Sequence, residues 1–77
     1  MKTWETTYGG AHILVENGFS REALTINGKL QDEGIGLASR SKLIGRLPGG
    51  LLVKVCLGGF WRIRCVIYVE DEKILDA

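Results

Sequence analysis

Apolar and polar residues alternate in short runs along the chain, and glycines interrupt these runs at turn-like intervals. Runs rich in Val, Ile, Leu and Thr that lie between such breaks are typical of an all-β protein. The alternation indicates strands with one buried face and one solvated face. The pattern predicts strands near residues 3–8, 11–17, 22–26, 29–33, 42–47, 51–57, 61–69 and 73–75.

The segment 35–47 also carries apolar residues at loosely helical spacing. Gly36 and Gly45 oppose a helix, because each glycine costs ~1 kcal/mol relative to alanine in a helix interior. We therefore expect a strand or an irregular loop in this segment, and a helix is the alternative.

Two stretches about 40 residues apart resemble each other, which indicates a repeated supersecondary unit. The sequence predicts a single β domain over residues 1–77, with pseudo-repeated four-strand halves at about 1–40 and 41–77. Two such halves form a small antiparallel β-sandwich or flattened barrel of about eight short strands. The matched positions are Gly9-Gly10 with Gly49-Gly50, Ile13 with Val53, Val15 with Val55, and 18–21 with 59–62.

The register of the hairpin near Gly58 decides which side chains share a face. A three-residue loop, 58–60, pairs Leu57 with Trp61 and places the apolar residues of both strands on one inner face. A two-residue loop would mix apolar and basic residues on both faces, so we predict the longer loop. The inner face then carries Leu51, Val53, Val55, Leu57, Trp61, Ile63, Cys65, Ile67 and Val69.

The same test at Asn27-Gly28 favours a three-residue loop, 27–29, that pairs Ile26 with Leu30 and Leu24 with Asp32. A two-residue turn is the usual expectation for Asn-Gly, but it would set Ile26 against a lysine and split the apolar pattern.

The outer face of the 51–69 hairpin is basic. Lys54, Arg62, Arg64 and Tyr68 share it, and the predicted register sets Lys54 directly opposite Arg64. Like charges so placed are unfavourable unless an acidic neighbour, an acidic partner or a phosphate lies nearby. A tyrosine on the same face could stack on a base or on a guanidinium plane. A second basic stretch, Arg40, Lys42 and Arg46, precedes Pro48.

The two cysteines fall on opposite faces of the predicted hairpin, so we expect no disulfide between them. Cys65 is predicted to be a small core residue. Cys56 is predicted to lie outside, across from Arg62, where nearby cations favour a thiolate and make a redox-sensitive thiol an alternative function.

No catalytic, metal or cofactor motif is found. His12 is the only histidine, and one histidine with two distant cysteines does not form a metal-ligand pattern. The carboxylates at 32–33 and 70–72 lie at predicted turns, and the glycine pairs match no phosphate-binding loop. We therefore expect no enzyme activity, no cofactor and no metal.

Charge and hydropathy narrow the classes of partner. Ten Lys+Arg residues against nine Asp+Glu give a formal charge of +1, far below the basic excess of a dedicated nucleic-acid-binding domain. No apolar run reaches the ~18 residues that a membrane span needs. The first residues lack the apolar core of a secretory signal, so the expected location is cytoplasmic.

Three stretches resemble the β-sandwich repeats of the Fas apoptosis inhibitory molecule family and small bacterial β domains of similar layout. These stretches are 26–33, 45–55 and 67–71. Each combines a strand, a polar turn and a return strand, although Glu70-Asp71-Glu72 has no glycine. The resemblance implies an antiparallel sandwich without known enzyme activity, and it transfers no functional residue.

The sequence thus predicts a non-enzymatic interaction or structural domain. Its partner is expected to be an acidic protein that meets Lys54, Arg62, Arg64 and Tyr68, or a second copy of the chain. A short chain buries a small share of its surface, so a homodimer would help its stability. Trp4 and Tyr8 share one side of the first strand and would suit strand-to-strand dimerisation if exposed at a sheet edge. Single-stranded nucleic acid at the same basic face is the alternative.

Overall fold

The computed structural model describes residues 1–35, 40–59 and 62–77, and eight strands lie within these residues. They form two antiparallel sheets with the strand orders β1-β2-β3-β4 and β5-β6-β7-β8. The predicted all-β class, with two four-stranded sheets, is confirmed. The strands are β1 Lys2–Tyr8, β2 Ala11–Asn17, β3 Glu22–Ile26, β4 Lys29–Gly34, β5 Arg40–Arg46, β6 Leu52–Gly58, β7 Arg64–Val69 and β8 Glu72–Asp76.

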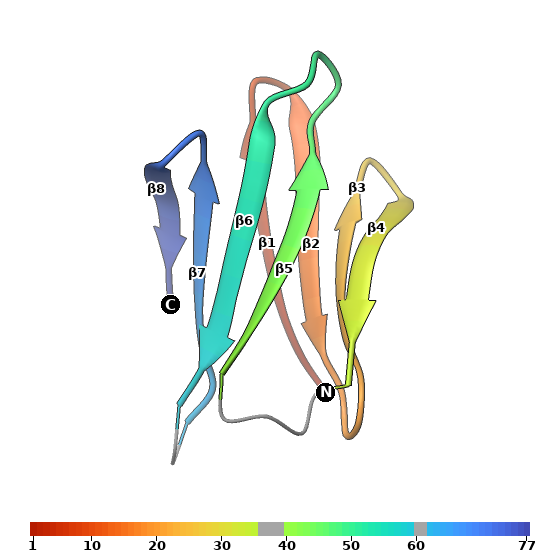
Figure 1. Cartoon of the computed structure of the whole chain (residues 1–77), viewed down its shortest axis with the longest axis vertical. Helices are drawn as coiled ribbons and strands as arrows, with labels where there is room; N and C mark the ends of the chain where they lie inside the picture. Colours follow the sequence, from red (N-terminus) through yellow and green to blue (C-terminus); the bar gives the residue numbers. More distant parts are fainter. Residues whose placement is uncertain (36–39, 60–61) are drawn as a thin grey trace.

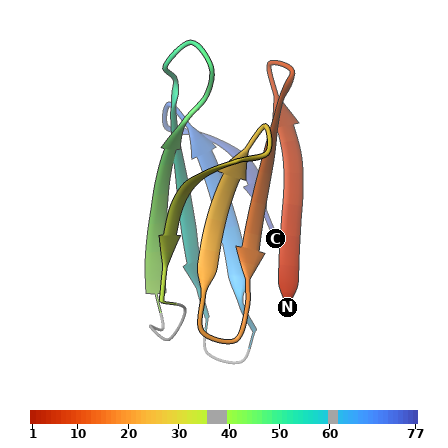
Figure 2. The same cartoon turned by 90° about the vertical axis from the view of Figure 1, so that its right-hand side faces the viewer.

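The two sheets face each other in a sandwich (Figure 1). The view turned by 90° shows β4 of the first sheet beside β5 of the second (Figure 2). The turns that join β1 to β2, β3 to β4, β5 to β6 and β7 to β8 all lie at the upper end in both views. Arg40 at the start of β5 and Gly58 at the end of β6 therefore lie at the lower end.

The core fills the space between the sheets and takes alternate residues from the strands. The strict inside–outside alternation of β6 and β7 follows from the pleat, which points successive side chains to opposite faces. Trp4 on the edge strand β1 is only 7% exposed, so it finishes the core and forms no exposed stripe with Tyr8. The buried cluster is Trp4, Ala11, Ile13, Val15, Leu24, Ile26, Leu43, Leu47, Val53, Val55, Leu57, Cys65, Ile67 and Val69.

The segment 35–47 contributes strand β5, so the strand prediction is confirmed for residues 40–46. Residues 36–39 lie outside the described part of the chain. Within that part there is no helix, and so none long and apolar enough to cross a membrane.

Side chains of β4 cover the free edge of β5. Asp32 Oδ2 accepts a hydrogen bond of 2.9 Å from the amide of Ile44, and Gln31 Oε1 accepts one of 3.3 Å from the amide of Arg46. An open strand edge invites pairing with other chains, and these contacts satisfy the exposed donors. The corner between the two sheets is therefore closed by side chains and not by a backbone ladder.

The turn at Asn27-Gly28 has two residues, so the predicted three-residue loop is wrong. Ile26 pairs with Lys29, and both turn residues have positive φ, 50° and 80°. Such angles suit a type I′ turn, which Asn-Gly favours and which matches the strand twist. The predicted pairing of Leu24 with Asp32 is nevertheless present, because a bulge between the pairs of Leu24 and Thr25 absorbs one residue.

The turn at Glu70-Asp71 repeats this geometry in the second sheet. Asn27 donates its amide to the His12 carbonyl, while its side-chain oxygen accepts from the His12 amide at 2.9 Å. Glu70 makes the same pair of contacts with Leu52, at 3.0 Å and 2.7 Å. The first residue of each turn, Asn27 or Glu70, thus adds hydrogen bonds at the end of the ladder between the two central strands of its sheet.

Replacing Asp71 by glycine is expected to stabilise the protein. Asp71 has a φ of 71°, in the left-handed region that disfavours a side chain, and Gly28 occupies the equivalent place in the first sheet with a φ of 80°. Asp71→Gly should raise the free energy of unfolding by about 1 kcal/mol, and Gly28→Asp should lower it by a similar amount. Urea titrations of both variants check this. An Asp71→Gly protein less stable than wild type would contradict it.

The hairpin between β6 and β7 keeps the predicted faces but has a different register. Leu57 pairs with Cys65 and Val53 with Val69, where the prediction paired Leu57 with Trp61 and Val53 with Cys65. The loop is therefore longer than three residues, and Trp61 lies outside the described residues. The Glu70–Leu52 contacts fix the observed register from the far end of the hairpin. Leu51, predicted to face inward, lies before β6 and is 40% exposed.

Candidate functional site

Cross-strand pairing arranges the outer face of the second sheet in rows. Because opposite residues on paired strands share a face, the observed registers decide which side chains are neighbours. Three rows matter here, and each runs from β5 towards β8. They are Arg40–Gly58–Arg64, Lys42–Cys56–Val66–Asp76 and Ile44–Lys54–Tyr68–Lys73.

Lys54 lies opposite Tyr68 and not opposite Arg64, so the predicted like-charge pair is wrong. The Lys54 ammonium sits 5.2 Å from the centre of the Tyr68 ring, within the range of a cation–π contact. Both residues are half-buried. The Lys54 ammonium and the Tyr68 ring therefore interact with each other, and the ring face that Lys54 covers is not free to stack on a ligand.

Arg64 forms an ion pair with Asp76 at the edge strand β8. The Nε and Nη2 atoms of Arg64 donate hydrogen bonds of 2.7 Å to Oδ1 and Oδ2 of Asp76. Lys73 also donates to Asp76, at 3.2 Å. Hydrogen bonds from Arg64, and then from Lys73, hold the pKa of the Asp76 carboxyl below its ordinary value. The charge of Arg64 is thus largely neutralised within the sheet.

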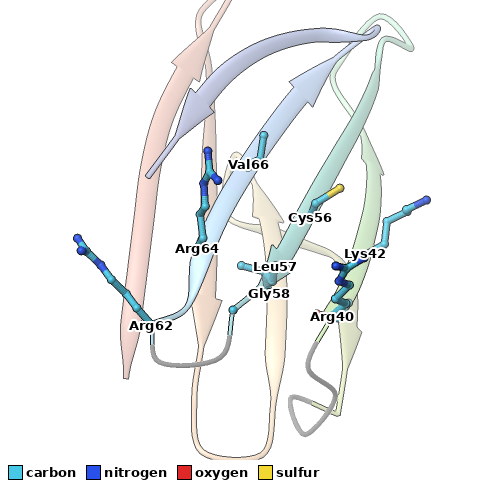
Figure 3. Close-up of a pocket in the computed structure, with 10 residues that line it drawn as sticks. Arg40, Lys42, Cys56, Leu57, Gly58, Arg62, Arg64 and Val66 are labelled. Atoms are coloured by element: carbon cyan, nitrogen blue, oxygen red, sulfur yellow. The ribbon is translucent and has the colours of Figure 1, made fainter.

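A hollow of about 740 Å³ opens on the outer face at the lower end of β5, β6 and β7 (Figure 3). Its centre is formed by Gly58, Cys56 and Val66. Among the described lining residues four are basic and none is acidic. The lining residues are Arg40, Ser41, Lys42, Cys56, Leu57, Gly58, Gly59, Arg62, Arg64 and Val66.

Three of the four basic residues have no acidic partner within residues 1–35, 40–59 and 62–77. Arg40, Lys42 and Arg62 make no ion pair there, in contrast to Arg64. All three side chains are exposed. We call this hollow the basic hollow, with Gly58, Cys56 and Val66 as its floor and Arg40, Lys42 and Arg62 as its unpaired cations. Its positive charge is available to a ligand.

The structure unites some of the predicted site residues and separates others. Arg62 and Arg64 line the basic hollow, whereas Lys54 and Tyr68 lie in the next row, above its floor. Arg40 and Lys42 were found in the sequence as a separate basic stretch, and their place beside Cys56 and Gly58 was missed. The available signal was the antiparallel pairing of consecutive strands, which sets β5 beside β6.

The two cysteines lie on opposite faces of the sheet, as predicted, and both are free thiols. Cys65 is fully buried, and burial, followed by the charge of Cys56, raises the pKa of its thiol from 9.0 to about 12. Cys56 is half-buried on the floor of the basic hollow. Its neighbours across the strands are Lys42 and Val66, so the predicted position opposite Arg62 is wrong.

Two further pairs of ionisable groups form local surface contacts. His12 Nε2 lies 3.2 Å from Glu5 Oε2, and Arg21 pairs with Glu33 at 2.6 Å. Within the described residues, no three His, Cys, Asp or Glu side chains gather closely enough to hold a metal ion. The basic hollow is therefore the feature of this surface with the clearest chemical preference, and that preference is for an anion.

No protein-family model, curated protein or solved structure matches this chain. The resemblance to the Fas apoptosis inhibitory molecule family stays a prediction.

Proposed function

We propose that this chain is a non-enzymatic interaction domain that binds an acidic protein partner at the basic hollow. The observation that carries the proposal is the set of three exposed cations, Arg40, Lys42 and Arg62, beside an uncharged floor. Charged side chains that lack partners on their own chain are free to form complementary pairs across an interface. The overall charge of +1 leaves this local field as the distinguishing electrostatic feature.

Two features favour an acidic protein over single-stranded nucleic acid. Nucleic-acid grooves combine basic residues with aromatic rings that are free to stack on bases. Here Lys54 covers the Tyr68 ring at 5.2 Å. The overall charge of +1 is also far below the basic excess of a dedicated nucleic-acid-binding domain.

Charge reversal at the rim is expected to weaken binding of a labelled glutamate-rich peptide. Arg40→Glu and Arg62→Glu each remove an attraction and add a repulsion, so each should weaken affinity roughly 5- to 10-fold at physiological salt. Arg64 is unsuitable for this test, because a glutamate there would face Asp76 and disturb the edge strand. Fluorescence anisotropy measures the effect.

The matched control is Lys29→Glu, which makes the same change in net charge at the first residue of β4. Its affinity for the peptide should stay within about twofold of wild type. Equal weakening by Lys29→Glu and Arg62→Glu would mean that net charge alone drives binding and would refute a site at the hollow. Retained affinity in folded Arg40→Glu and Arg62→Glu variants would do the same.

A further inference from the structure

A glycine lies in the middle of one of the rows that line the basic hollow. Gly58 lies in the middle of the row Arg40–Gly58–Arg64, and the strand pairing points its missing side chain outward. Each neighbouring strand lies about 4.8 Å away, so an arginine flanks the bare backbone on either side. An anionic group placed over Gly58 would meet Arg40 from the β5 side, whereas the Arg64 side chain runs along β7 away from Gly58 (Figure 3).

The two arginines would act on such an anion in different ways. Asp76 uses the Nε and Nη2 atoms of Arg64, which fixes the guanidinium plane and leaves its Nη1 donors unused by that pair. Arg40 has no acidic partner among the described residues and contributes uncompensated charge. An anion over Gly58 would therefore be attracted mainly by Arg40.

The next row supplies a small apolar platform. Cys56 and Val66 are both half-buried and pair directly across β6 and β7. The platform lies two residues along the strand from Gly58, a distance of about 6.8 Å. It is one row deep, because the following row is filled by Lys54 over the Tyr68 ring. A long acyl chain would therefore find no continuous apolar surface, whereas a single apolar side chain would.

The side chains on one side of an extended peptide are separated by the same distance as Gly58 and this apolar platform. Its side chains at positions i and i+2 point to one side and lie about 6.8 Å apart. A carboxylate of such a peptide seated over Gly58 would place a side chain two residues away over Cys56 and Val66.

We propose that the basic hollow binds an extended partner segment in which an acidic and an apolar residue are separated by one residue. This proposal rests on the proposed function. The carboxylate sits over Gly58 beside Arg40, and the apolar side chain covers Cys56 and Val66. Lys42 and Arg62 attract further acidic residues that flank the pair.

Three blocked peptides that differ at one position each test this inference. Their cores are Glu-Ala-Leu, Glu-Ala-Ser and Gln-Ala-Leu in one neutral flanking sequence, with capped termini so that no terminal charge contributes. Binding to the wild-type protein is followed by amide chemical shifts in NMR spectra. The Glu-Ala-Leu peptide should bind at least about tenfold more tightly than either of the other two, with the largest shifts at Cys56, Gly58 and Val66.

Two variants probe the floor without changing its charge. Gly58→Val fills the part of the hollow over Gly58 with a side chain that suits a strand, and it should weaken Glu-Ala-Leu binding about tenfold. If Gly58→Val fails to fold, Val66→Thr replaces a methyl by a hydroxyl at the same volume. It should remove the preference for leucine over serine while the affinity for the glutamate-rich peptide is retained.

Alkylation of Cys56 gives an independent readout in the wild-type protein, because the other thiol, Cys65, is buried. Bound Glu-Ala-Leu peptide should slow the reaction of Cys56 at least about fivefold, and Glu-Ala-Ser should not at the same occupancy. If the two peptides slowed the alkylation of Cys56 equally, the result would contradict an apolar contact at Cys56.

The outcomes separate this inference from the proposed function. Equal binding of the Glu-Ala-Leu and Glu-Ala-Ser peptides, with a normal response to Arg62→Glu, would refute the apolar platform and leave the acidic partner in place. Absence of binding by every acidic peptide would refute both. Tighter, steeply salt-dependent binding of a single-stranded oligonucleotide at the same amides would also refute both, in favour of nucleic acid.

Discussion

Gly45→Val is expected to lower the free energy of unfolding of this protein. Gly45 lies on the inner side of β5, where the sheets meet at the β4–β5 corner. A Cβ added there would lie 2.9 Å from Gln31 Cβ and 3.0 Å from Leu24 Cδ2. Overpacking of this kind forces side chains off their rotamers and shifts backbone, at about 1–3 kcal/mol or more. Because Gln31 also caps the Arg46 amide, the variant should lose part of the corner as well.

Gly34→Val is the matched control for this change. Gly34 also lies in a strand, without positive φ, and nothing lies within 4 Å of a Cβ built there. Valine should be neutral or slightly stabilising at that place, since it restricts the unfolded chain. Urea unfolding of the two variants gives the comparison. A Gly45→Val protein as stable as Gly34→Val would show that the sheets can separate at this corner without cost.

Alkaline pH is expected to destabilise the protein through Cys65. Burial raises the pKa of this thiol from 9.0 to about 12, so the folded state holds its proton to higher pH than the unfolded state does. The contribution of the protonated Cys65 thiol to the free energy of unfolding is fully present below about pH 9 and is lost as pH rises towards about pH 12. The loss should reach about 2 kcal/mol near pH 10.5, since each unit of pKa difference is worth about 1.36 kcal/mol.

The comparison of wild type with Cys65→Ala isolates this contribution, because lysine and tyrosine titrations are common to both proteins. The variant should be less stable at neutral pH, where it leaves a cavity, but its stability should fall less steeply between pH 8 and about pH 10.5. Parallel pH curves for the two proteins would contradict a proton held by Cys65. Cys56 should react with an alkylating agent throughout, whereas Cys65 should react only on unfolding.

The alternation of apolar and polar residues was sufficient to predict the strands and their faces. Val53, Val55, Leu57, Cys65 and Ile67 all face inward as the sequence indicates, because a pleated strand has a side-chain period of two. The prediction survived an error in register, since the observed pairing differs from the predicted one by an even number of residues. Both registers place the same side chains of β6 and β7 on the inner face.

Alternation by itself could not fix the register. Any even shift keeps the faces unchanged, so an additional contact has to choose among the shifts. In the second sheet that contact is Glu70 with the backbone of Leu52, across 18 residues of sequence. At Asn27-Gly28 the hydrophobic pattern pointed to the wrong loop length, because a bulge further along β4 restores the apolar match.

The sequence by itself determined the all-β class, the two sheets of four strands and the opposite faces of the two cysteines, all of which follow from local periodicity and turn chemistry. Only the tertiary structure decided how the basic residues are grouped. Pairing of β5 with β6 brings Arg40 and Lys42 to the glycine and cysteine of the hollow, while the register sends Lys54 to Tyr68 and Arg64 to Asp76. Charge neighbours depend on the alignment of whole strands, and that alignment is set by contacts far apart in the chain.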